Sequence, residues 1–512
     1  MRSNISALRV DKFGGAAALL FILLATGCAR PKTADLPIET ELPPSQAPLW
    51  SALAAARTDD WFYLLNTGME GLEWRLKMID SATTSIDLET FLWQPDSSGM
   101  QIQAHILAAA DRGVRVRFLL DDSFTMHEDL ALHGLDDHPN IDLRIYNPLR
   151  HRSNSAFWRE LFNIGEFSRI NHRMHNKLLI IDGRAALVGG RNLADEYFGF
   201  DASMNFRDME VITTGVSVAG TIRHFDAFWN SGWALPLGDV IPEPADADSL
   251  NELRERLVTS APVPANPDPE LLDEAWLSIE SRGFAGSADF YFDEPAVEDP
   301  AAPDYAPDQL AGELQRLIEN ANQEVIIISA YLVPTDNLHD AIKSAEQRGA
   351  EVRILTNSLK SNNHLAAHAA YRGHVEKLID NGVDLYEVRV KATDRNLYMQ
   401  SPVDKKELGL HAKLLLIDDD IAFIGSCNLD PRSLKINTEV GLIIRSFELN
   451  QALRQDLNID FDPSNAWKVE RDNKGKVVWI GAEGVFPGPP DASQIERLED
   501  WFIGLLPIDQ EM

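Results

Sequence analysis

The feature that most constrains this chain is a spaced motif that occurs twice. Residues 175–192 are HNKLLIIDGRAALVGGRN and residues 411–428 are HAKLLLIDDDIAFIGSCN, so both fit H-x-K-x4-D-x6-G-[GS]-x-N. The segments before each copy also correspond: a helix pattern, a strand pattern, a helix pattern closed by Arg-Gly, and another strand pattern. A repeat of this length predicts two copies of one structural unit in tandem.

Alternating helix and strand patterns favour an α/β fold, with a mixed sheet flanked by helices in each unit and a pseudo-twofold axis relating the units. Pro-rich acidic stretches at 236–248 and 287–308 indicate a connector, and the pattern LNELRERLV between them predicts one short helix. The predicted organisation is a signal peptide at 1–28, a flexible tether at 29–48, a first domain at 49–235, the connector at 236–308, and a second domain at 309–512.

The motif itself predicts a buried hairpin. LLIID and LLLID are apolar enough for buried strands, and residues two apart in a strand share a face. His175 and Lys177 therefore point the same way, whereas Asp182, seven positions after His175, points to the other face. We expect Asp182 and its counterpart Asp418 to be structural, with Asp182-Gly183 at the turn. Small residues at the ends of the return strands leave room for a ligand or a close backbone approach: Gly189, Gly190, Gly425 and Ser426.

Two half-sites facing each other would suit a phosphodiester. Lysines and asparagines can surround its non-bridging oxygens, one histidine can attack phosphorus, and the other can protonate the leaving oxygen and then deprotonate the acceptor. Side chains supply the positive charge, so this chemistry requires no metal and no cofactor. The expected catalytic groups are His175, Lys177 and Asn192 in the first half, and His411, Lys413 and Asn428 in the second.

Each histidine should also have an acidic partner that fixes its tautomer. Glu439 follows the second motif in NLDPRSLKINTEVGLII, and Asp208 occupies the like place after the first motif in NFRDMEVIT. Glu210 is a weaker alternative to Asp208. The residues alone do not say which histidine attacks phosphorus.

The two motifs resemble the phospholipase D superfamily. Further segments, among them GVRVRFLLDD, FSRINHRMHNK, VGGRNLADEYFG and GSCNLDPRS, resemble the bacterial cardiolipin synthase C type from about residue 50 onward. The resemblance implies two tandem domains, a phosphohistidine intermediate with His175 as nucleophile, and formation of cardiolipin from phosphatidylglycerol and a second phospholipid, either phosphatidylglycerol or phosphatidylethanolamine. A hydrolase acting on phospholipid, or less readily on nucleic acid, is the first alternative. A non-catalytic lipid-binding scaffold is the second.

The resemblance and a local basic segment suggest where substrate binds. Six Lys or Arg and two Glu lie between Arg150 and Lys177, where anionic headgroups would be attracted, and AFWRELFNIGEF within that segment is either a bilayer contact or a core helix. Both half-sites lie in one chain, so we expect a monomer. The tentative substrate-binding residues are Arg152, Arg173, Tyr331, His368 and Tyr371.

The N-terminus resembles a bacterial lipoprotein signal. Basic residues precede an apolar run from Phe13 to Ala25, which is shorter than the ~20 residues of a membrane span. LLATGC then places Cys28 as the expected lipidation site, although an ordinary signal peptide or a short anchor would also fit. We expect an exported, periplasm-facing protein at a membrane surface, with inner or outer membrane left open. The net charge of −32 argues against nucleic acid as partner.

Three weaker signals remain. Cys427 lies inside the second motif, and we interpret it as a small buried residue. His364 and His368 are four apart on a helix pattern, but no further ligand completes a zinc set, so a helix surface or pocket wall is expected. WFIGLLPI near the C-terminus is interpreted as a core segment, because short apolar runs are usually packed.

Overall fold

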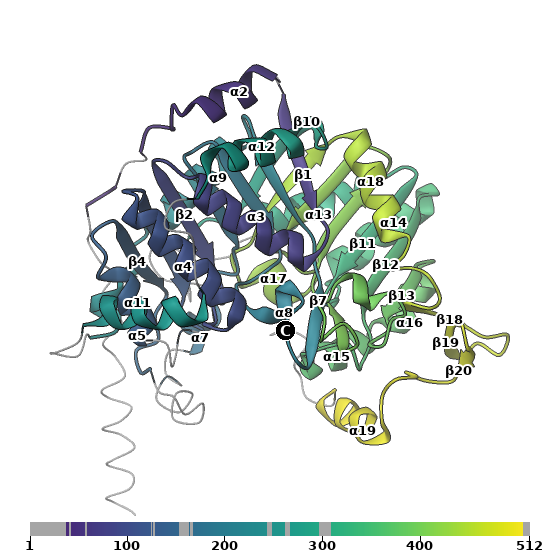
Figure 1. Cartoon of the computed structure of the whole chain (residues 1–512). Coiled ribbons are helices and arrows are strands. Elements are labelled where there is room, and N and C mark those ends of the chain that lie inside the picture. Colours follow the sequence, from purple (N-terminus) through teal and green to yellow (C-terminus); the bar gives the residue numbers. More distant parts are fainter. Residues whose placement is uncertain are drawn as a thin grey trace, which may run out of the picture.

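The computed structural model describes residues 37–39, 42–56, 59–123, 125, 129–152, 163, 167–242, 248–261, 267–295 and 309–504. The expected signal peptide and Cys28 lie outside these residues, as do half of the tether and nearly all of AFWRELFNIGEF. Within the described part of the chain, no helix is long and apolar enough to cross a bilayer. The two halves of the repeat form two α/β units side by side (Figure 1).

The first unit begins after a short helix, α2 (Pro48–Ala56), and ends at β9. Its helices are α3 (Gly68–Ser81), α4 (Ser97–Asp111), α5 (Asp129–Asp136), α7 (Phe167–Asn171), α8 (Asp195–Phe198) and α9 (Val218–Trp229). Its strands are β1 (Asp60–Leu65), β2 (Ser85–Thr90), β3 (Arg115–Asp121), β4 (Ile141–Tyr146), β5 (Leu178–Ile181), β6 (Ala185–Gly189), β7 (Met204–Arg207), β8 (Glu210–Thr214) and β9 (Ala234–Pro236).

The second unit repeats this order and extends it. Its helices are α13 (Gln309–Asn320), α14 (Asp336–Arg348), α15 (Leu365–Arg372), α16 (Val375–Asp380), η3 (Arg395–Leu397), α17 (Pro431–Lys435), α18 (Phe447–Leu457) and α19 (Gln494–Ile503). Its strands are β11 (Glu324–Ser329), β12 (Glu351–Asn357), β13 (Asp384–Val388), β14 (Glu407–Leu410), β15 (Lys413–Ile417), β16 (Ile421–Gly425), β17 (Val440–Arg445), β18 (Ala466–Arg471), β19 (Val477–Gly481) and β20 (Gly484–Phe486).

The connector differs from its prediction. Where the sequence predicts one short helix, the structure has α10 (Leu237–Val240), α11 (Ser249–Ser260), α12 (Pro269–Glu280) and the strand β10 (Phe284–Phe292). β10 pairs antiparallel with β1 through Phe284–Gly286 and with β17 through residues 287–292, so it joins the sheets of both units. Residues 287–292 of the predicted connector therefore form a regular strand, because backbone hydrogen bonds to β17 satisfy its polar groups.

One continuous mixed sheet therefore runs through both units. Its order is β9-β4-β3-β2-β5-β6-β8-β1-β10-β17-β16-β15-β11-β12-β13-β18-β19-β20. β2, β3 and β4 pair in parallel, as do β11, β12 and β13, while each motif hairpin is antiparallel. β10 has the same position in the second unit that β1 has in the first. β1 pairs with β8 and β10 pairs with β17, and β8 and β17 are the strands that lie next to the two motif hairpins in the sheet. The predicted tandem α/β architecture is confirmed.

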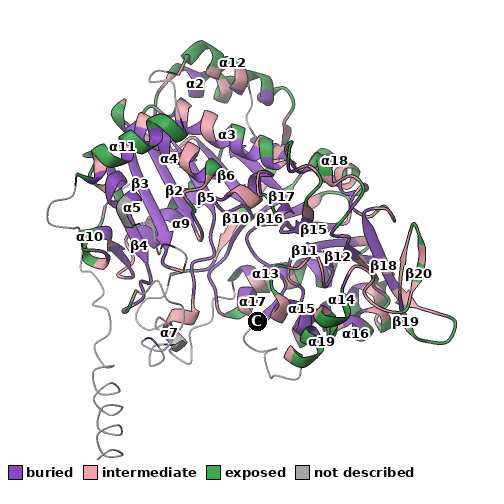
Figure 2. Cartoon of the chain, turned by 60° about the horizontal axis from the view of Figure 1, so that its bottom comes forward, coloured by how far each residue is buried: buried purple, intermediate pink, exposed green. Residues whose placement is uncertain are grey.

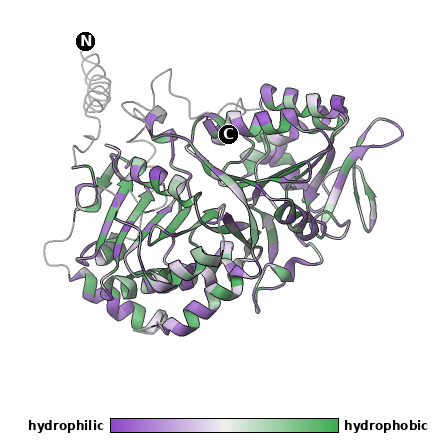
Figure 3. Ribbon diagram, turned by 90° about the horizontal axis from the view of Figure 1, so that it is seen from above, coloured by the Kyte–Doolittle hydropathy of each residue, from purple (hydrophilic) through white to green (hydrophobic). Residues whose placement is uncertain are grey.

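Packing follows the two-residue period of the motif strands. Leu178 and Ile180 enter a buried cluster that both units share, whereas Leu179 and Ile181 enter the cluster under the outer helices of the first unit. The second motif strand alternates in the same way, and α9 and α18 contribute side chains to the shared cluster. Buried strands and exposed helix faces are visible in Figure 2, and the outer helices mix hydrophilic and hydrophobic residues in Figure 3.

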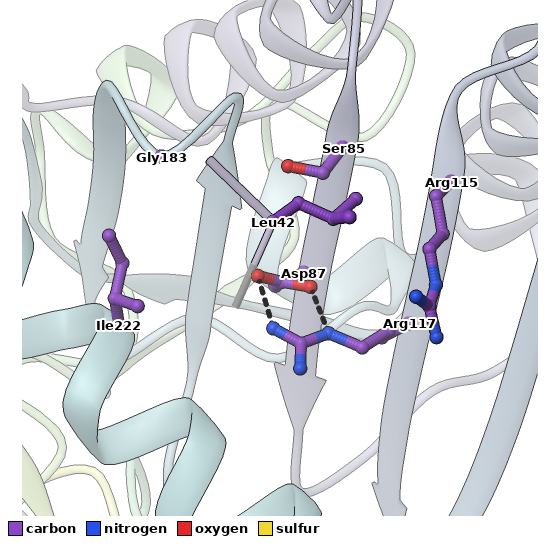
Figure 4. A pocket seen from close by; sticks show the side chains of 7 residues that line it. All are labelled: Leu42, Ser85, Asp87, Arg115, Arg117, Gly183 and Ile222. Atoms are coloured by element: carbon purple, nitrogen blue, oxygen red, sulfur yellow. Dashed lines mark hydrogen bonds and ion pairs between the residues drawn. The ribbon is translucent and has the colours of Figure 1, made fainter. Parts of the chain in front are cut away.

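Charged side chains also tie the first sheet together. Arg117 on β3 forms a two-pronged hydrogen-bonded ion pair with Asp87 on β2, at 2.7 and 2.9 Å (Figure 4). It also donates to Asp226 on α9 at 2.8 Å. Because the guanidinium is buried but fully paired, it links two parallel strands to the helix that covers them.

Asp182 makes the contacts expected of a structural residue. The tight turn between β5 and β6 has positive φ at Asp182 (56°) and Gly183 (59°), which Asp and Gly tolerate better than most residues. The carboxylate of Asp182 accepts hydrogen bonds from the backbone amides of Thr83, Thr84 and Ser85 at 2.7–3.1 Å, and from the side chains of Thr83 and Trp50 at 2.7 and 2.9 Å. It thereby fixes the start of β2, at the end of the strands remote from His175.

The prediction for WFIGLLPI is wrong where the structure describes it. Trp501 and Phe502 on α19 are 52% and 65% exposed. Asp500, which directly precedes Trp501 on the same helix, is buried. The physical reason is that α19 turns its polar side inward, where ion pairs hold it.

Candidate active site

Each motif histidine is positioned by a backbone contact with the opposite unit. Before the first motif, Met174 forms a parallel bridge with Thr438, and the His175 amide donates to the Thr438 carbonyl at 3.0 Å. Before the second motif, β14 pairs in parallel with β7, and the His411 amide donates to the Arg207 carbonyl at 2.8 Å. The residues next in sequence to Thr438 and Arg207 are the two predicted carboxylates.

The two histidine–carboxylate pairs consequently cross between the units. His175 Nδ1 lies 2.9 and 3.0 Å from the carboxylate oxygens of Glu439, and His411 Nδ1 lies 2.8 Å from Asp208 Oδ2. All four side chains are at least nine-tenths buried. A carboxylate at Nδ1 holds the proton there and leaves Nε2 free for chemistry. Glu210, the alternative to Asp208, instead pairs with Arg75 and Arg191.

The motif lysines are buried beside the histidines. Lys177 Nζ donates to the His175 carbonyl and Lys413 Nζ to the His411 carbonyl, both at 2.5 Å. Burial lowers the pKa of Lys177 to about 7 and that of Lys413 to about 8, although Glu439 and Asp208 raise both. A phosphate anion bound nearby would favour the charged form of both lysines, because its negative charge would compensate the ammonium groups for their loss of hydration.

Small residues at the end of each return strand leave room for a carboxylate of the segment that packs against it. A Cβ atom on Gly189 would lie 2.4 Å from Cγ of Glu210, and one on Gly190 would lie 2.7 Å from Oδ1 of Asp208. In the second unit Ser426 stands where Gly190 does, and its hydroxyl donates to Glu439 Oε2 at 2.5 Å. The glycines thus provide for a close approach of the next strand.

Gly190→Ala is expected to displace Asp208 from His411 and lower kcat by about 10- to 100-fold, since sub-ångström errors in catalytic geometry are costly. Ser426→Gly, which removes only a hydroxyl contact, should cost less. Steady-state kinetics with circular dichroism as a check on folding measures both. A Gly190→Ala variant with unchanged kcat would contradict this account of the glycine.

A cavity of about 550 Å³ joins the two half-sites. Both histidines and both asparagines line it. An aromatic edge flanks each imidazole: Phe91 lies 5.0 Å from His175 and Tyr197 lies 4.9 Å from His411, measured between ring centroids. The remaining lining residues are Leu92, Gln94, Ser123, Arg173, Glu196, Tyr331, Val333, Asn363, His364, Ala367, Asp430, Arg432, Ser433 and Asn437.

The charges around this cavity break the symmetry of the repeat. Glu196 lies four residues after Asn192, and Arg432 lies four residues after Asn428, so equivalent positions carry opposite charge. Arg432 is held by Asn171 of the first unit at 2.6 Å, and Arg173 lines the same cavity. Burial raises the pKa of Glu196 to about 7. Sequence reasoning missed Glu196 and Arg432, although their shared offset from the motif asparagines was a usable signal.

The tentative substrate-binding residues divide into two groups. Arg173 and Tyr331 line the cavity. Arg152 forms an ion pair with Asp122 and is not among the lining residues, and His368 and Tyr371 lie on α15 with their side chains outside the cavity lining. His368 Nδ1 bonds to Asp500 at 2.7 Å and the Tyr371 hydroxyl donates to Glu387 at 3.0 Å. Both face a buried polar network because α15 turns Ala367, not His368, toward the cavity, so the structure places neither of them at the candidate substrate site.

The two crossed pairs are electrostatically unequal. Burial and the charges of Lys177 and Lys413 lower the pKa of His175 well below its usual value, and burial and Lys413 lower that of His411 to about 3. Burial raises the pKa of Glu439 to about 8. Against the effect of burial, the hydrogen bond and charge of His411 lower the pKa of Asp208 to about 2. Asp208 is thus the better partner for a histidine that becomes charged.

Other candidate chemistry finds no support here. Burial raises the pKa of the Cys427 thiol well above its usual value, and its Sγ donates to the Asn428 carbonyl, so it behaves as a packed residue. His364 is a pocket-wall residue, stacked edge-on to Tyr331. Among the residues that the structure describes, no group of three or more His, Cys, Asp or Glu is arranged to hold a metal ion.

Two tandem α/β units that share a cavity lined by both motif histidines and asparagines, with the motif lysines buried beside the histidines, define the phospholipase D superfamily, and sequence comparison agrees. A model of the family described as "Cardiolipin synthase, PLD-like domain" matches residues 76–229 and 314–460. The chain belongs to this family and is a superfamily enzyme of the phosphatidyltransferase type.

Named relatives cover most of the chain. Cardiolipin synthase C of Escherichia coli (strain K12) is 32% identical over 464 residues, which span 87% of this chain and 94% of that protein. Cardiolipin synthase 2 of Bacillus anthracis is 26% identical over 422 residues, 81% of this chain and 67% of that protein. The crystal structure of phosphatidylserine synthase from Haemophilus influenzae Rd KW20 shares the fold, with a TM-score of 0.54 at 15% identity over 90% of this chain and 100% of that one.

Proposed function

We propose that this enzyme forms cardiolipin from phosphatidylglycerol and a second phospholipid, either phosphatidylglycerol or phosphatidylethanolamine, through a phosphohistidine intermediate. The observation that carries the proposal is the pair of crossed histidine–carboxylate dyads on one cavity, lined by Arg173 and Arg432. The names of the relatives support the lipid product. The expected N-terminal signal and lipidation of Cys28 would hold such an enzyme at its substrate membrane.

In the proposed first step, Nε2 of His175 attacks phosphorus, an N–P bond forms, and the P–O bond to the leaving headgroup breaks. His411 donates a proton to the leaving oxygen. In the second step a glycerol hydroxyl of the acceptor phosphatidylglycerol attacks phosphorus, His411 takes its proton, and the N–P bond to His175 breaks. The asparagine side chains and the buried lysines stabilise the charge that develops on the non-bridging oxygens.

The unequal dyads support this assignment of roles. An attacking histidine must be neutral, and His175 beside the high-pKa Glu439 has little tendency to hold a second proton. The acid–base histidine must pass through a cationic form, and ionised Asp208 stabilises that cation at His411. A phosphodiester anion in the cavity raises the pKa of His411 and makes protonation accessible near neutral pH.

Lipid mass spectrometry tests the proposal. Purified full-length protein is incubated with phosphatidylglycerol vesicles, with and without phosphatidylethanolamine, beside a His175→Asn control. Cardiolipin with released glycerol or ethanolamine is the expected product. Phosphatidic acid as the sole product would show that water is the acceptor and would replace the transferase by a hydrolase. Intact lipid in every sample would favour a non-catalytic lipid-binding protein.

The buried lysines predict the pH dependence. With pKa values of about 7 and about 8, Lys177 and Lys413 lose their charge in the free enzyme as the pH rises through this range. The phosphodiester keeps its charge, so kcat/KM should fall between about pH 7 and about pH 9. Lys177→Arg, which stays charged, should move the fall to higher pH if the variant turns over. A profile that stays flat up to about pH 10 would exclude these lysines as its cause.

A further inference from the structure

α19 is an amphipathic helix mounted with its polar side inward. Glu496 and Asp500 share one face by helical spacing and lie toward the body together with Ile503, and Asp500 is 2% exposed. Ile495, Leu498, Trp501 and Phe502 lie on the opposite side and are 69%, 64%, 52% and 65% exposed. Figure 2 shows this helix at the edge of the molecule. A surface helix of a globular protein usually has the reverse arrangement.

Specific polar contacts hold the helix in this orientation. Asp500 accepts from His368 at 2.7 Å and pairs with Arg372 at 3.3 Å, both on α15. Glu496 pairs with Lys360 at 2.8 Å and forms a capping box with Ser493. The apolar side therefore stays outward because its polar side is engaged, and it exposes a contiguous set of large side chains to solvent.

α19 lies next to an element that lines the candidate active site. α19 packs on α15, and α15 contributes Ala367 and its N-cap residue His364 to the wall of the catalytic cavity. Across the cavity, the segment that includes α7 and Arg173 belongs to the first unit. Figure 1 shows α7 and α19 on the same lower side of the molecule. A lipid that approaches the cavity from this side would meet both.

We propose that the outward face of α19 (Ile495, Leu498, Trp501 and Phe502) docks onto a phospholipid bilayer beside the cavity mouth. This inference rests on the proposed function, since a lipid substrate must leave a bilayer to reach His175. The charge of the chain also points to an apolar contact, because a net charge of −32 gives no general attraction to an anionic surface. Trp and Phe on one helix face insert at the headgroup boundary, and the cavity arginines then receive the headgroup.

A fluorophore on the helix tests docking directly. In full-length protein carrying Cys28→Ser, which removes the N-terminal thiol, Phe502→Cys is labelled with an environment-sensitive dye. Phe447→Cys on α18, 52% exposed in the parent, is the matched control. Vesicles of phosphatidylglycerol and phosphatidylethanolamine should shift the emission at 502 to the blue and leave 447 unchanged. No shift at 502, or equal shifts at both, would overturn the proposal, as would a vesicle-independent shift that grows with protein concentration and reveals self-association.

Turnover provides the second test. Leu498→Ser/Trp501→Ser/Phe502→Ser should lower turnover of vesicle-embedded phosphatidylglycerol about tenfold, because the apolar docking surface is lost. Turnover of a short-chain, monomeric phosphatidylglycerol should not change. The control Leu271→Ser/Leu277→Ser/Phe447→Ser removes exposed side chains of α12 and α18 and should affect neither substrate. Equal losses on both substrates would refute docking. If the parent turns over neither lipid, the proposed function fails, while the fluorescence still decides whether α19 docks.

Discussion

His411→Asn should lower phosphatidyl transfer by about 10³- to 10⁴-fold while leaving the protein folded, and His175→Asn should do so at least as strongly. Both side chains line the cavity and are buried against a carboxylate from the other unit. The asparagine amide can replace the Nδ1–H bond but has no Nε2 to attack phosphorus or move a proton. Mass spectrometry of lipid products at several enzyme concentrations measures the loss.

The two variants should differ in what they accumulate. With phosphatidylglycerol labelled on its phosphate, His411→Asn should retain label on the protein, because the nucleophile is intact and the acid–base group is missing. His175→Asn should retain none. Label on His411 in the His175→Asn variant would reverse the assignment of the two roles. The Cys427→Ser variant, which alters a packed thiol, should behave as the parent.

Asp182→Asn should lower the free energy of unfolding by about 3 kcal/mol or more, with turnover per folded molecule little changed. The carboxylate accepts five hydrogen bonds in a buried site, and hydrogen bonds to a charged group contribute about 1.5–3 kcal/mol each. Asparagine tolerates the positive φ of 56°, so the change isolates the loss of the carboxylate. Urea unfolding followed by circular dichroism gives the difference.

Asp418→Asn is the internal control for this prediction. Asp418 has the same place in the second hairpin and a positive φ of 49°, but it is more exposed and accepts from three backbone amides, at Asn322, Gln323 and Glu324. Its loss should cost roughly half as much. If Asp182→Asn abolished turnover without lowering stability, the carboxylate would have a catalytic role after all.

The sequence predicts best what depends on local periodicity. Leu178 to Ile181 alternate between two cores, and the turn at Asp182 and Gly183 follows from neighbouring residues alone. The repeat then extends each prediction to the second unit. The strand β10 was not predicted, because the Pro-rich, acidic composition of its surroundings indicated a connector. Its sequence FAGSADFYF nevertheless alternates in burial along most of its length.

Long-range pairing could not be predicted in the same way. That Glu439 partners His175, and Asp208 partners His411, depends on the contacts of Met174 with Thr438 and of β14 with β7. Neither contact has a signature within one unit. The orientation of α19 was missed for a related reason: its apolar residues predict packing, but the ion pairs of Asp500 with α15 decide which side faces inward.

The crossed dyads set a minimum size for a working enzyme. A first unit separated from the second would keep His175 but lose Glu439, and the second would keep His411 but lose Asp208. Each fragment would also lose the strand contact that holds its histidine in place. The chain is therefore equivalent to a dimer whose subunits have been joined covalently. The two units can differ in sequence, as the equivalent positions Glu196 and Arg432 do, but both units are required for a complete site.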